Sequence, residues 1–219
     1  MTEIKTGKAI IPIHDGDIGI SASGGADSSA LLYVLMSHMN PKNHIHIYCF
    51  GRASTHYSTI AGSRALARRI SDLTGFTNYT IHADYDDEQN KSTLFRAPNA
   101  AICSGLFERM YTGITADPPR EVAFSWQIPT DNGMYKTHDE HVHQMRDPTV
   151  HREPIAGDLI MPFTNLNKQD IADIYTDLGI IETVYPYTRS CESYDPRYLG
   201  THCGTCWWCQ ERVWGFGKL

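Results

Sequence analysis

The sequence predicts an α/β protein: a parallel β-sheet covered by helices on both faces, with a small C-terminal appendage that contains four cysteines. Three observations carry this prediction. Short apolar segments typical of buried strands alternate with segments of helical spacing over residues 18–126. A glycine- and serine-rich loop joins the first such strand to the first such helix, and three regularly spaced cysteines stand close to the C-terminus.

The expected elements have recognisable boundaries. Apolar segments with strand character lie at residues 18–22, 44–50, 78–83 and 121–126. Helical spacing indicates helices at residues 28–39, 55–74, 98–112 and 168–178. We expect the helix over residues 168–178 to be the last helix of the chain. Pro98 is expected near a helix start, Asn167 as a helix cap and Gly179 as a helix end. Residues 131–157 are polar and rich in histidine and proline, which predicts a long loop.

The loop after the first strand has the character of a phosphate-binding site. Residues 21–29 read Ser-Ala-Ser-Gly-Gly-Ala-Asp-Ser-Ser. Gly24 and Gly25 can adopt backbone angles closed to other residues, so several N–H groups can point at one anion. The following helix adds the positive end of its dipole, and the hydroxyls of Ser23, Ser28 and Ser29 can donate hydrogen bonds. Ligands of such sheets bind beyond the strand ends, so segments 50–51, 84–85 and 127–131 should face the same crevice.

Asp27 makes the predicted phosphate site more specific, because it indicates a nucleotide bound with a cation. A carboxylate beside phosphates repels them unless a divalent cation lies between, so Asp27 predicts Mg²⁺ that arrives with a nucleotide. The loop has neither the Gly-Lys-Ser/Thr ending nor the G-x-G-x-x-G pattern of the better-known phosphate loops. The alternative is a Gly-Gly turn with a serine or aspartate helix cap. The strand before and the helix after the loop favour the nucleotide site.

Length and charge limit the class of protein. The 219 residues can bury one sizeable core, so we expect one main domain, residues 1–180, and a small C-terminal segment, residues 181–219. The hydrophobic fraction of 41%, the lack of a long apolar run and the polar N-terminus predict a cytoplasmic protein without a membrane segment. The formal charge of −6 argues against a nucleic-acid partner and favours a small substrate.

Four cysteines near the C-terminus form the second strong signal. Cys203, Cys206 and Cys209 follow one another at intervals of three, and Cys191 lies twelve residues before the first of them. In a reducing compartment, four converging thiolates are better explained by a structural tetrahedral Zn²⁺ site than by disulfides. The alternatives are an iron–sulfur cluster and unligated thiols. His202 competes with Cys191 as the fourth ligand but stands inconveniently beside Cys203.

The remaining cysteines and a group of histidines carry weaker signals. Cys49, in a predicted strand, and Cys103, in a predicted helix, are each expected to be a buried thiol. The loop contains four histidines that could serve as metal ligands or proton carriers, but no H-E-x-x-H frame organises them, and a hydrated loop is favoured. These residues are His138, His141, His143 and His151.

These motifs resemble a known family. The Ser-Gly-Gly-x-Asp-Ser loop resembles that of the N-type ATP pyrophosphatases (the PP-loop superfamily), which include GMP synthetase, NAD synthetase, asparagine synthetase and several tRNA-modifying enzymes. Within that group, the C-terminal part resembles 7-cyano-7-deazaguanine synthase. The motif residues are Ser190, Cys191, Cys203, Gly204, Cys206, Cys209, Arg212, Gly215 and Phe216. More loosely similar are residues 96–99, residues 161–163, Lys168 and Gly179.

One segment departs from the family pattern. After an Asp that corresponds to Asp131, the family usually carries Gly-Tyr-Pro-Asp-Cys-Arg in its substrate region. Here residues 132–138 read Asn-Gly-Met-Tyr-Lys-Thr-His. The departure leaves the nucleotide and metal sites intact but puts the acceptor substrate in question.

The resemblance implies an adenine nucleotide α-hydrolase-like, Rossmann-like fold and a set of site residues. Asp27, Ser28 and Lys168 would be catalytic, and Cys191, Cys203, Cys206 and Cys209 would bind Zn²⁺. Arg96, Asn99 and Asp131 are candidates for contacts with the acceptor or the adenine. The implied ATP-binding residues are Ser21, Ser23, Gly24, Gly25, Ala26, Asp27, Ser28, Ser29 and Phe50.

The activity that the resemblance implies is an ATP-dependent C–N ligation. A deazapurine carboxylate, 7-carboxy-7-deazaguanine, would form an acyl-adenylate, react with free ammonia to the amide, and be dehydrated to the nitrile with a second ATP, with Mg²⁺ at the phosphates. The start Met1-Thr2 offers no cysteine nucleophile for glutamine hydrolysis, which favours free ammonia. The alternatives are adenylation of another small acid or a tRNA base, and a nucleotide-binding module without catalysis. Related folds often form homodimers, although no motif here indicates one.

Overall fold

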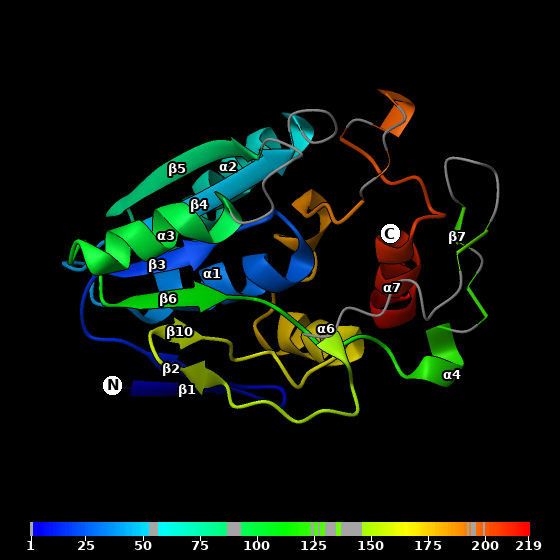
Figure 1. The fold of residues 1–219 in the computed structure, drawn as a ribbon, viewed down its shortest axis with the longest axis horizontal. Helices are drawn as coiled ribbons and strands as arrows, with labels where there is room; N and C mark the ends of the chain where they lie inside the picture. Colours follow the sequence, from blue (N-terminus) through cyan, green and yellow to red (C-terminus); the bar gives the residue numbers. More distant parts are fainter. Residues whose placement is uncertain are drawn as a thin grey trace.

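A six-stranded sheet forms the centre of the molecule (Figure 1). The computed structural model describes residues 2–52, 57–86, 93–123, 125–126, 128–129, 135–136, 146–191, 193, 196–198 and 200–219. The strand order is β5-β4-β3-β6-β10-β9, with parallel pairing throughout except for β9 at the edge. The strands are β3 (Ile18–Ser21), β4 (Ile45–Arg52), β5 (Tyr79–Asp86), β6 (Arg109–Thr112), β9 (Ile155–Ala156) and β10 (Leu159–Ile160). The predicted α/β class with a parallel sheet is confirmed.

The strand order reverses beside β3. From β3 the chain proceeds outward through β4 to β5, and then returns to the other side of β3 to form β6. Ile20 of β3 pairs with Ile47 on one side and with Tyr111 on the other, and all three side chains are buried. Crossovers that leave a strand in opposite directions open a crevice at its C-terminal end, where ligands of such sheets bind. The loop after β3 therefore lies at the switch point of the sheet.

Helices cover both faces of the sheet, as predicted. α1 and α2 pack on one face around a core that includes Leu31, Leu35 and Ile70, and α6 packs beside α1. On the other face, the end of α3 and the turn after it pack Ala101 and Phe107 against strand residues (Figure 1). The helices are α1 (Ala26–His38), α2 (Tyr57–Thr74), α3 (Thr93–Cys103), α4 (Arg120–Ala123), α6 (Lys168–Asp177) and α7 (Trp207–Phe216).

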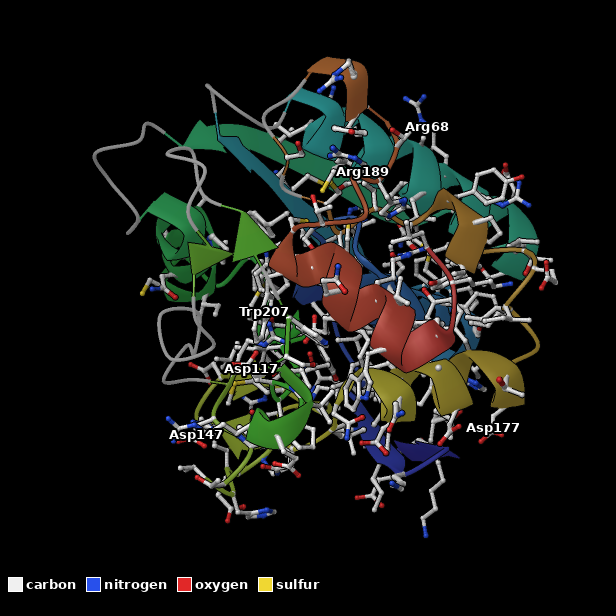
Figure 2. The ribbon with its side chains drawn as sticks, turned by 90° about the vertical axis from the view of Figure 1, so that its right-hand side faces the viewer. Arg68, Asp117, Asp147, Asp177, Arg189 and Trp207 are labelled. Carbon is white, nitrogen blue, oxygen red and sulfur yellow. The ribbon has the colours of Figure 1, made fainter. Side chains whose placement is uncertain are left out.

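The C-terminal helix α7 lies across the end of the sheet to which the strands point (Figures 1 and 2). It packs against α6, and Phe216 contacts the same core as α1. Two hairpins complete the fold: β1 (Thr2–Thr6) with β2 (Ala9–Ile13), and β7 (Ile128–Pro129) with β8 (Tyr135–Lys136). Neither these hairpins nor α7 was predicted, and α6 is not the last helix. None of the helices in the described residues combines the length and the apolar character needed to span a membrane.

The predicted helix over residues 98–112 is wrong in its second half. α3 begins at Thr93, contains Pro98 in its interior and ends at Cys103. Gly105 has a φ of +74°, which turns the chain away from the helix axis. The next residues form β6, which pairs with β3 and β10. Neighbouring strands on both sides supply the hydrogen bonds that stabilise β6, although the sequence of this short strand does not predict a strand.

The predicted strand over residues 121–126 is also wrong. Residues 120–123 form the short helix α4, in which the carbonyl of Pro119 accepts hydrogen bonds from the N–H groups of Val122 and Ala123. Proline favours the first turn of a helix because its fixed φ suits that position. The fourth central strand is β6, and the apolar residues of this segment instead pack beside Trp207.

Candidate active site and metal centre

A cavity of about 220 Å³ opens at the switch point of the sheet. Its wall combines the loop after β3, the segment after β6 and side chains from two later parts of the chain. The lining residues are Ser21, Ser23, Asp27, Ser28, Thr112, Gly113, Ile114, Thr115, Arg146 and Trp208. The cavity thus meets the predicted phosphate loop at the position where a parallel sheet of this order binds ligands.

The loop leaves the first amides of α1 open to a ligand. Gly25 is the N-cap of α1 and no side chain caps the helix, so the alternative of a serine or aspartate cap is wrong. Gly24 has a φ of +78°, and a Cβ there would lie 2.8 Å from Ser63 Oγ. A glycine is therefore required for both the turn and its close packing. The hydroxyl groups of Ser23 and Ser28 lie 3.3 Å apart beside the uncapped amides.

The predicted loop serines do not all face the cavity. Ser21, Ser23 and Ser28 line it, as does Asp27. The hydroxyl of Ser29 is buried and donates to the carbonyl of Gly25 at 2.7 Å, so it stabilises the first turn of α1.

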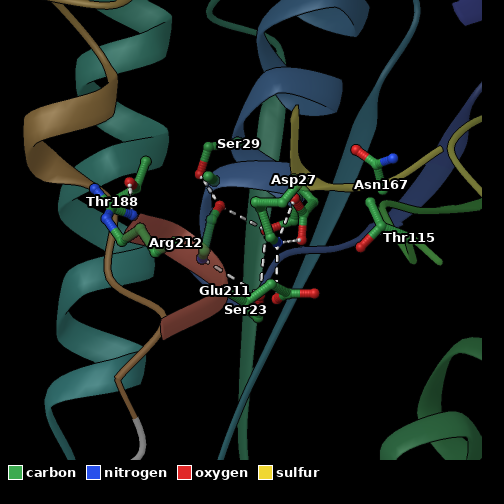
Figure 3. A network of polar contacts seen from close by, with 12 residues as sticks. Ser23, Asp27, Ser29, Thr115, Asn167, Thr188, Glu211 and Arg212 are labelled. Atoms are coloured by element: carbon green, nitrogen blue, oxygen red, sulfur yellow. Dashed lines mark hydrogen bonds and ion pairs between the residues drawn. The ribbon is translucent and has the colours of Figure 1, made fainter. Parts of the chain in front are cut away.

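Asp27 forms an ion pair with Lys168 (Figure 3). Lys168 Nζ donates to both carboxylate oxygens of Asp27, at 2.5 and 2.7 Å. Lys168 is the first residue of α6, and the side chain of Asn167 caps that helix as predicted, in a capping box with Asp170. The lysine side chain is only 4% exposed, whereas that of Asp27 is 21% exposed and reaches the cavity. Two predicted catalytic residues, 141 positions apart, thus meet at the cavity.

A buried ion-pair network extends from this pair to α7. Glu211 lies 3.4 Å from Lys168 Nζ through Oε2, and its Oε1 contacts the guanidinium of Arg146. Arg146 also lies 3.1 Å from Asp117 and donates to the carbonyl of Thr115 at 2.9 Å. Burial alone would raise the pKa of Glu211, but the positive charges of Arg146 and Lys168 outweigh it, and the pKa is lowered. Glu211 is therefore ionised at neutral pH.

Arg146 and Trp208 both line the cavity and contact one another. The guanidinium carbon of Arg146 lies 4.9 Å from the centre of a Trp208 ring, a cation–π arrangement. Burial opposes the charge of Arg146, but Glu211 and Asp117 outweigh this effect and raise its pKa. The cavity wall thus contains a guanidinium group, paired with two carboxylates, and an aromatic ring.

The segment before the first metal-site cysteine touches the phosphate loop. The N–H of Arg189 donates to the carbonyl of Gly24 at 2.8 Å. A Cβ at Gly25 would lie 3.2 Å from Ser190 Oγ, so the serine side chain packs directly on the loop. Ser190 is followed at once by Cys191. The cysteine cluster and the loop are therefore joined by two residues of backbone.

The four predicted metal ligands converge. The sulfur atoms of Cys191, Cys203, Cys206 and Cys209 all lie within 4.8 Å of one another, and Cys203 Sγ and Cys209 Sγ are 3.9 Å apart. Backbone N–H groups point at these sulfurs, from Cys206 to Cys203 and from Cys203 to Cys191, each at 3.3 Å. Such donors stabilise thiolates, so the site fits a bound metal ion. His202 is not part of this group of ligands.

Other predicted residues lie elsewhere. Asn99 is exposed on α3, and Arg96 belongs to the same helix. Phe50 lies in β4; its side chain and that of Arg96 are outside the described residues, as is Asp131. Cys49 is buried, as expected, but Cys103 is exposed at the end of α3, so that expectation is wrong.

The histidine group cannot be assessed as a whole. His138, His141 and His143 lie outside the described residues, and His151 is exposed.

The sequence analysis missed the other lining residues and two carboxylates of the ion-pair network: Thr112, Gly113, Ile114, Thr115, Arg146, Trp208, Asp117 and Glu211. Trp208 and Glu211 flank Cys209, so the spacing that identified the cysteines could have drawn attention to them. Arg146 stands in the polar loop without any local pattern. Only the folded chain brings it to Glu211, 65 positions away.

The parallel sheet, the loop at its switch point and the four-cysteine cluster agree with the predicted resemblance to the PP-loop ATP pyrophosphatases. The family model of the queuosine biosynthesis protein QueC matches residues 137–219, which include Lys168 and all four cysteines. This match confirms the resemblance to the 7-cyano-7-deazaguanine synthase type and supports an ATP-using enzyme. It covers less than half of the chain.

Solved structures show more distant likeness. The U34-tRNA thiolase NcsA from Methanococcus maripaludis, with its 4Fe-4S cluster, is 12% identical with a TM-score of 0.45; the match covers 83% of this chain and 63% of the thiolase. NMN synthetase from Francisella tularensis is 11% identical with a TM-score of 0.45, and the match covers 94% of this chain and 78% of the synthetase. The chain thus spans less than two thirds of the thiolase. No curated protein matches the sequence.

Proposed function

We propose that this protein is an ATP-dependent ligase that converts 7-carboxy-7-deazaguanine and ammonia to 7-cyano-7-deazaguanine through an acyl-adenylate. The observation that carries the proposal is the cavity at the switch point, which is lined by residues of the uncapped first turn of α1, including Asp27, the carboxylate that pairs with Lys168. The match of residues 137–219 to the QueC family supports the choice of substrate.

The nucleotide phosphates would occupy the loop side of the cavity. The first amides of α1 and the hydroxyl groups of Ser23 and Ser28 are the donors available to them. Asp27 is the carboxylate that would hold Mg²⁺, because its oxygens face the cavity and carboxylates are the ligands that Mg²⁺ prefers. The bound cation would offset phosphate charge. Lys168 would supply a second positive charge at the same phosphates.

The chemistry then divides into two activations. A carboxylate oxygen of the substrate attacks the α-phosphorus of ATP, and the bond to pyrophosphate breaks. Ammonia attacks the acyl carbon, loses a proton, and AMP leaves with the electrons of the C–O bond. In the second activation the amide oxygen attacks the α-phosphorus of a second ATP, and the bond to pyrophosphate breaks. The adenylated amide then loses two protons from its nitrogen, and AMP leaves with the electrons of the C–O bond to give the nitrile. The donors at the loop would stabilise the charge that grows on the leaving pyrophosphate.

We propose that the cysteine cluster holds one structural Zn²⁺. A tetrahedral ion with metal–sulfur bonds of about 2.3 Å separates its sulfurs by roughly 3.8 Å, close to the 3.9 Å between Cys203 and Cys209. A four-iron cluster would spread the thiolates farther apart, because each binds a different iron. Four cysteine ligands leave no open position for catalysis at the ion. A reducing, cytoplasmic location agrees with this site.

The organisation of the chain is also proposed. We regard residues 1–180 as the nucleotide-binding domain and residues 181–219 as the metal-binding segment that covers its ligand end. A homodimer is the proposed assembly; light scattering that gives the mass of one chain would contradict it.

The test is a defined assay with the purified protein, MgATP, ammonium and 7-carboxy-7-deazaguanine. Mass spectrometry should detect the amide and the nitrile, with AMP and pyrophosphate formed only when the acid is present. Lys168→Ala should abolish turnover, while Lys42→Ala, a change on the surface turn after α1, should leave it intact. Turnover of ATP without amide or nitrile would reject the substrate and keep the enzyme class.

A second candidate acceptor is another small acid. The departure from the family pattern after Asp131 favours it, because that segment belongs to the substrate region of the resembling enzymes. A panel of heteroaromatic acids, tested for AMP release, separates the two candidates. Nucleotide binding by calorimetry with no turnover on any acid would instead indicate a binding module without catalysis.

A further inference from the structure

Glu211 connects the metal-binding segment to the Asp27–Lys168 pair. It belongs to α7 and stands two residues after Cys209, and its side chain is 1% exposed. Its Oε1 contacts Arg146. Its Oε2 is buried and accepts no hydrogen bond from the described residues, although Lys168 Nζ lies 3.4 Å away. The Oε2 atom of Glu211 therefore faces the ammonium group of Lys168 without accepting a hydrogen bond from it.

Lys168 stands between two unequal carboxylates (Figure 3). It is 2.5 Å from Asp27 and 3.4 Å from Glu211. Asp27 lines the cavity, where a ligand can reach it, whereas Glu211 is enclosed by protein. The stem of the lysine packs on α7, because a Cβ at Gly215 would lie 2.4 Å from Lys168 Cγ. The lysine stem is therefore held beside α7, the helix that carries Glu211.

We infer that Glu211 is a positioning residue that retains Lys168 when Asp27 turns to a cation bound with the nucleotide. The inference rests on the proposed nucleotide site. Asp27 accepts the short contacts from Lys168 Nζ, and Glu211 lies within reach of the same ammonium group. A divalent cation at Asp27 would compete with Lys168 for that carboxylate, and Glu211 would then hold the ammonium that Asp27 releases.

The alternative is that Glu211 serves only as a counter-ion for Arg146. Arg146 has a second carboxylate, Asp117, and the carbonyl of Thr115. Among the described residues, the ion-pair partners of Lys168 are Asp27 and Glu211. Loss of the Glu211 charge should therefore affect mainly Lys168. The lysine would then remain paired with Asp27 and compete with the incoming cation for this carboxylate.

The experiment measures how strongly Mg²⁺ promotes nucleotide binding. Calorimetry gives the Kd of α,β-methylene-ATP, which cannot be cleaved between those phosphates, with Mg²⁺ and with EDTA. The ratio of the two Kd values is the coupling. Glu211→Gln should lower this coupling about tenfold. In a Lys168→Met background the same change should have no effect, because Glu211 acts through the lysine.

Asp117→Asn is the matched control. It removes one buried carboxylate from Arg146, as Glu211→Gln does, and should leave the coupling unchanged. If Glu211→Gln does not fold, as judged by thermal unfolding, Glu211→Asp replaces it; this variant should lower the coupling less, and again only when Lys168 is present.

The outcomes separate the two proposals. An equal effect of the Glu211 change with and without Lys168 would mean a structural role and overturn the inference. A wild-type protein that binds no α,β-methylene-ATP with Mg²⁺ would overturn the proposed nucleotide site itself.

Discussion

At the scale of single residues, Gly113 determines how closely the sheet approaches the phosphate loop. A Cβ at this position would lie 2.8 Å from the backbone nitrogen of Ser28 and 2.9 Å from the carbonyl carbon of Asp27. These are backbone atoms of the first turn of α1, which cannot move aside without moving the loop. The residue after β6 must therefore be a glycine for the cavity to keep its shape.

Gly113→Ala should accordingly weaken nucleotide binding. We expect a loss of about 1–3 kcal/mol in the free energy of unfolding from the forced backbone shift. The Kd for α,β-methylene-ATP should rise, because the displaced amides belong to the binding loop. Gly62→Ala is the control: a Cβ there meets nothing within 4 Å, and alanine in helix α2 should stabilise the protein by about 1 kcal/mol. Unchanged binding in Gly113→Ala would contradict the role given to this contact.

His46 makes stability depend on pH. Its ring is buried, and its Nδ1 lies 3.0 Å from Nε2 of His82 on the neighbouring strand. Burial first, and then the charges of His44 and His82, lower its pKa to about 4, while Asp17 acts in the opposite direction. The unfolded chain therefore binds a proton at a higher pH than the folded one. Stability is lost as the pH falls from about 6.5 toward 4.

Urea unfolding at pH 7.5 and pH 5.0 tests this dependence. The wild type should lose on the order of 1 kcal/mol more stability at pH 5.0 than His46→Gln does. Both proteins should carry the metal, since acid also protonates thiolates. Equal losses in the two proteins would exclude His46 as the cause.

At the scale of elements, the start of α6 positions Lys168. The side chain of Asn167 accepts hydrogen bonds from the N–H groups of Gln169 and Asp170, and Asp170 accepts one from the N–H of Asn167. Because Lys168 is the first helical residue, this cap fixes the direction in which the lysine leaves the helix. The local sequence thus determines one end of the Asp27–Lys168 pair.

Asn167→Ala should destabilise the protein by about 1 kcal/mol through loss of the cap. The side chain of Lys168 should also lose some of its order, so the kcat of the proposed ligase should fall, while the proposed metal content of the cysteine cluster should stay unchanged. Thr176→Ala, near the other end of α6, removes an exposed hydroxyl that bonds to the carbonyl of Ala172 and serves as the control. Thermal unfolding and steady-state kinetics measure both variants. A stability loss no larger than that of Thr176→Ala would contradict the prediction.

The sequence and the structure agree best on elements with local signals. The loop over residues 21–29, the helices α1 and α6 and the cysteine cluster were predicted from patterns within a few residues. β6 was missed because its four residues carry no alternation, and pairing with β3 and β10 overrides their helical spacing. α7 was missed because the cysteine spacing was interpreted as a turn motif alone.

At the scale of the whole molecule, the four-cysteine cluster and the proposed nucleotide site share one piece of chain. Cys191 is two residues from Arg189, whose N–H bonds to the loop, and α7 begins directly after Cys206 and carries Glu211. A bound ion would therefore order both the loop and the network around Lys168. The small C-terminal segment contributes Trp208 to the wall of the cavity.

Removal of the metal should consequently affect ligand binding as well as stability. Chelation, or Cys206→Ser, should lower stability by an amount on the order of several kcal/mol and weaken binding of α,β-methylene-ATP. Cys103→Ser is the matched control, because this thiol is exposed and lies outside the cluster. Elemental analysis, thermal unfolding and calorimetry make the comparison. Full nucleotide affinity in the metal-free protein would show that the two sites are independent.

The sequence by itself determined the loop, its aspartate, the cap of α6 and the four sulfur ligands, because each depends on residues that are close in the chain. The tertiary structure alone decided which charges meet at the cavity. Asp27 and Lys168 are 141 positions apart, and Arg146 and Glu211 are 65 apart. No local propensity encodes such distances. They follow from the order of the strands, which places the end of β3, the end of β6 and helix α7 around one crevice.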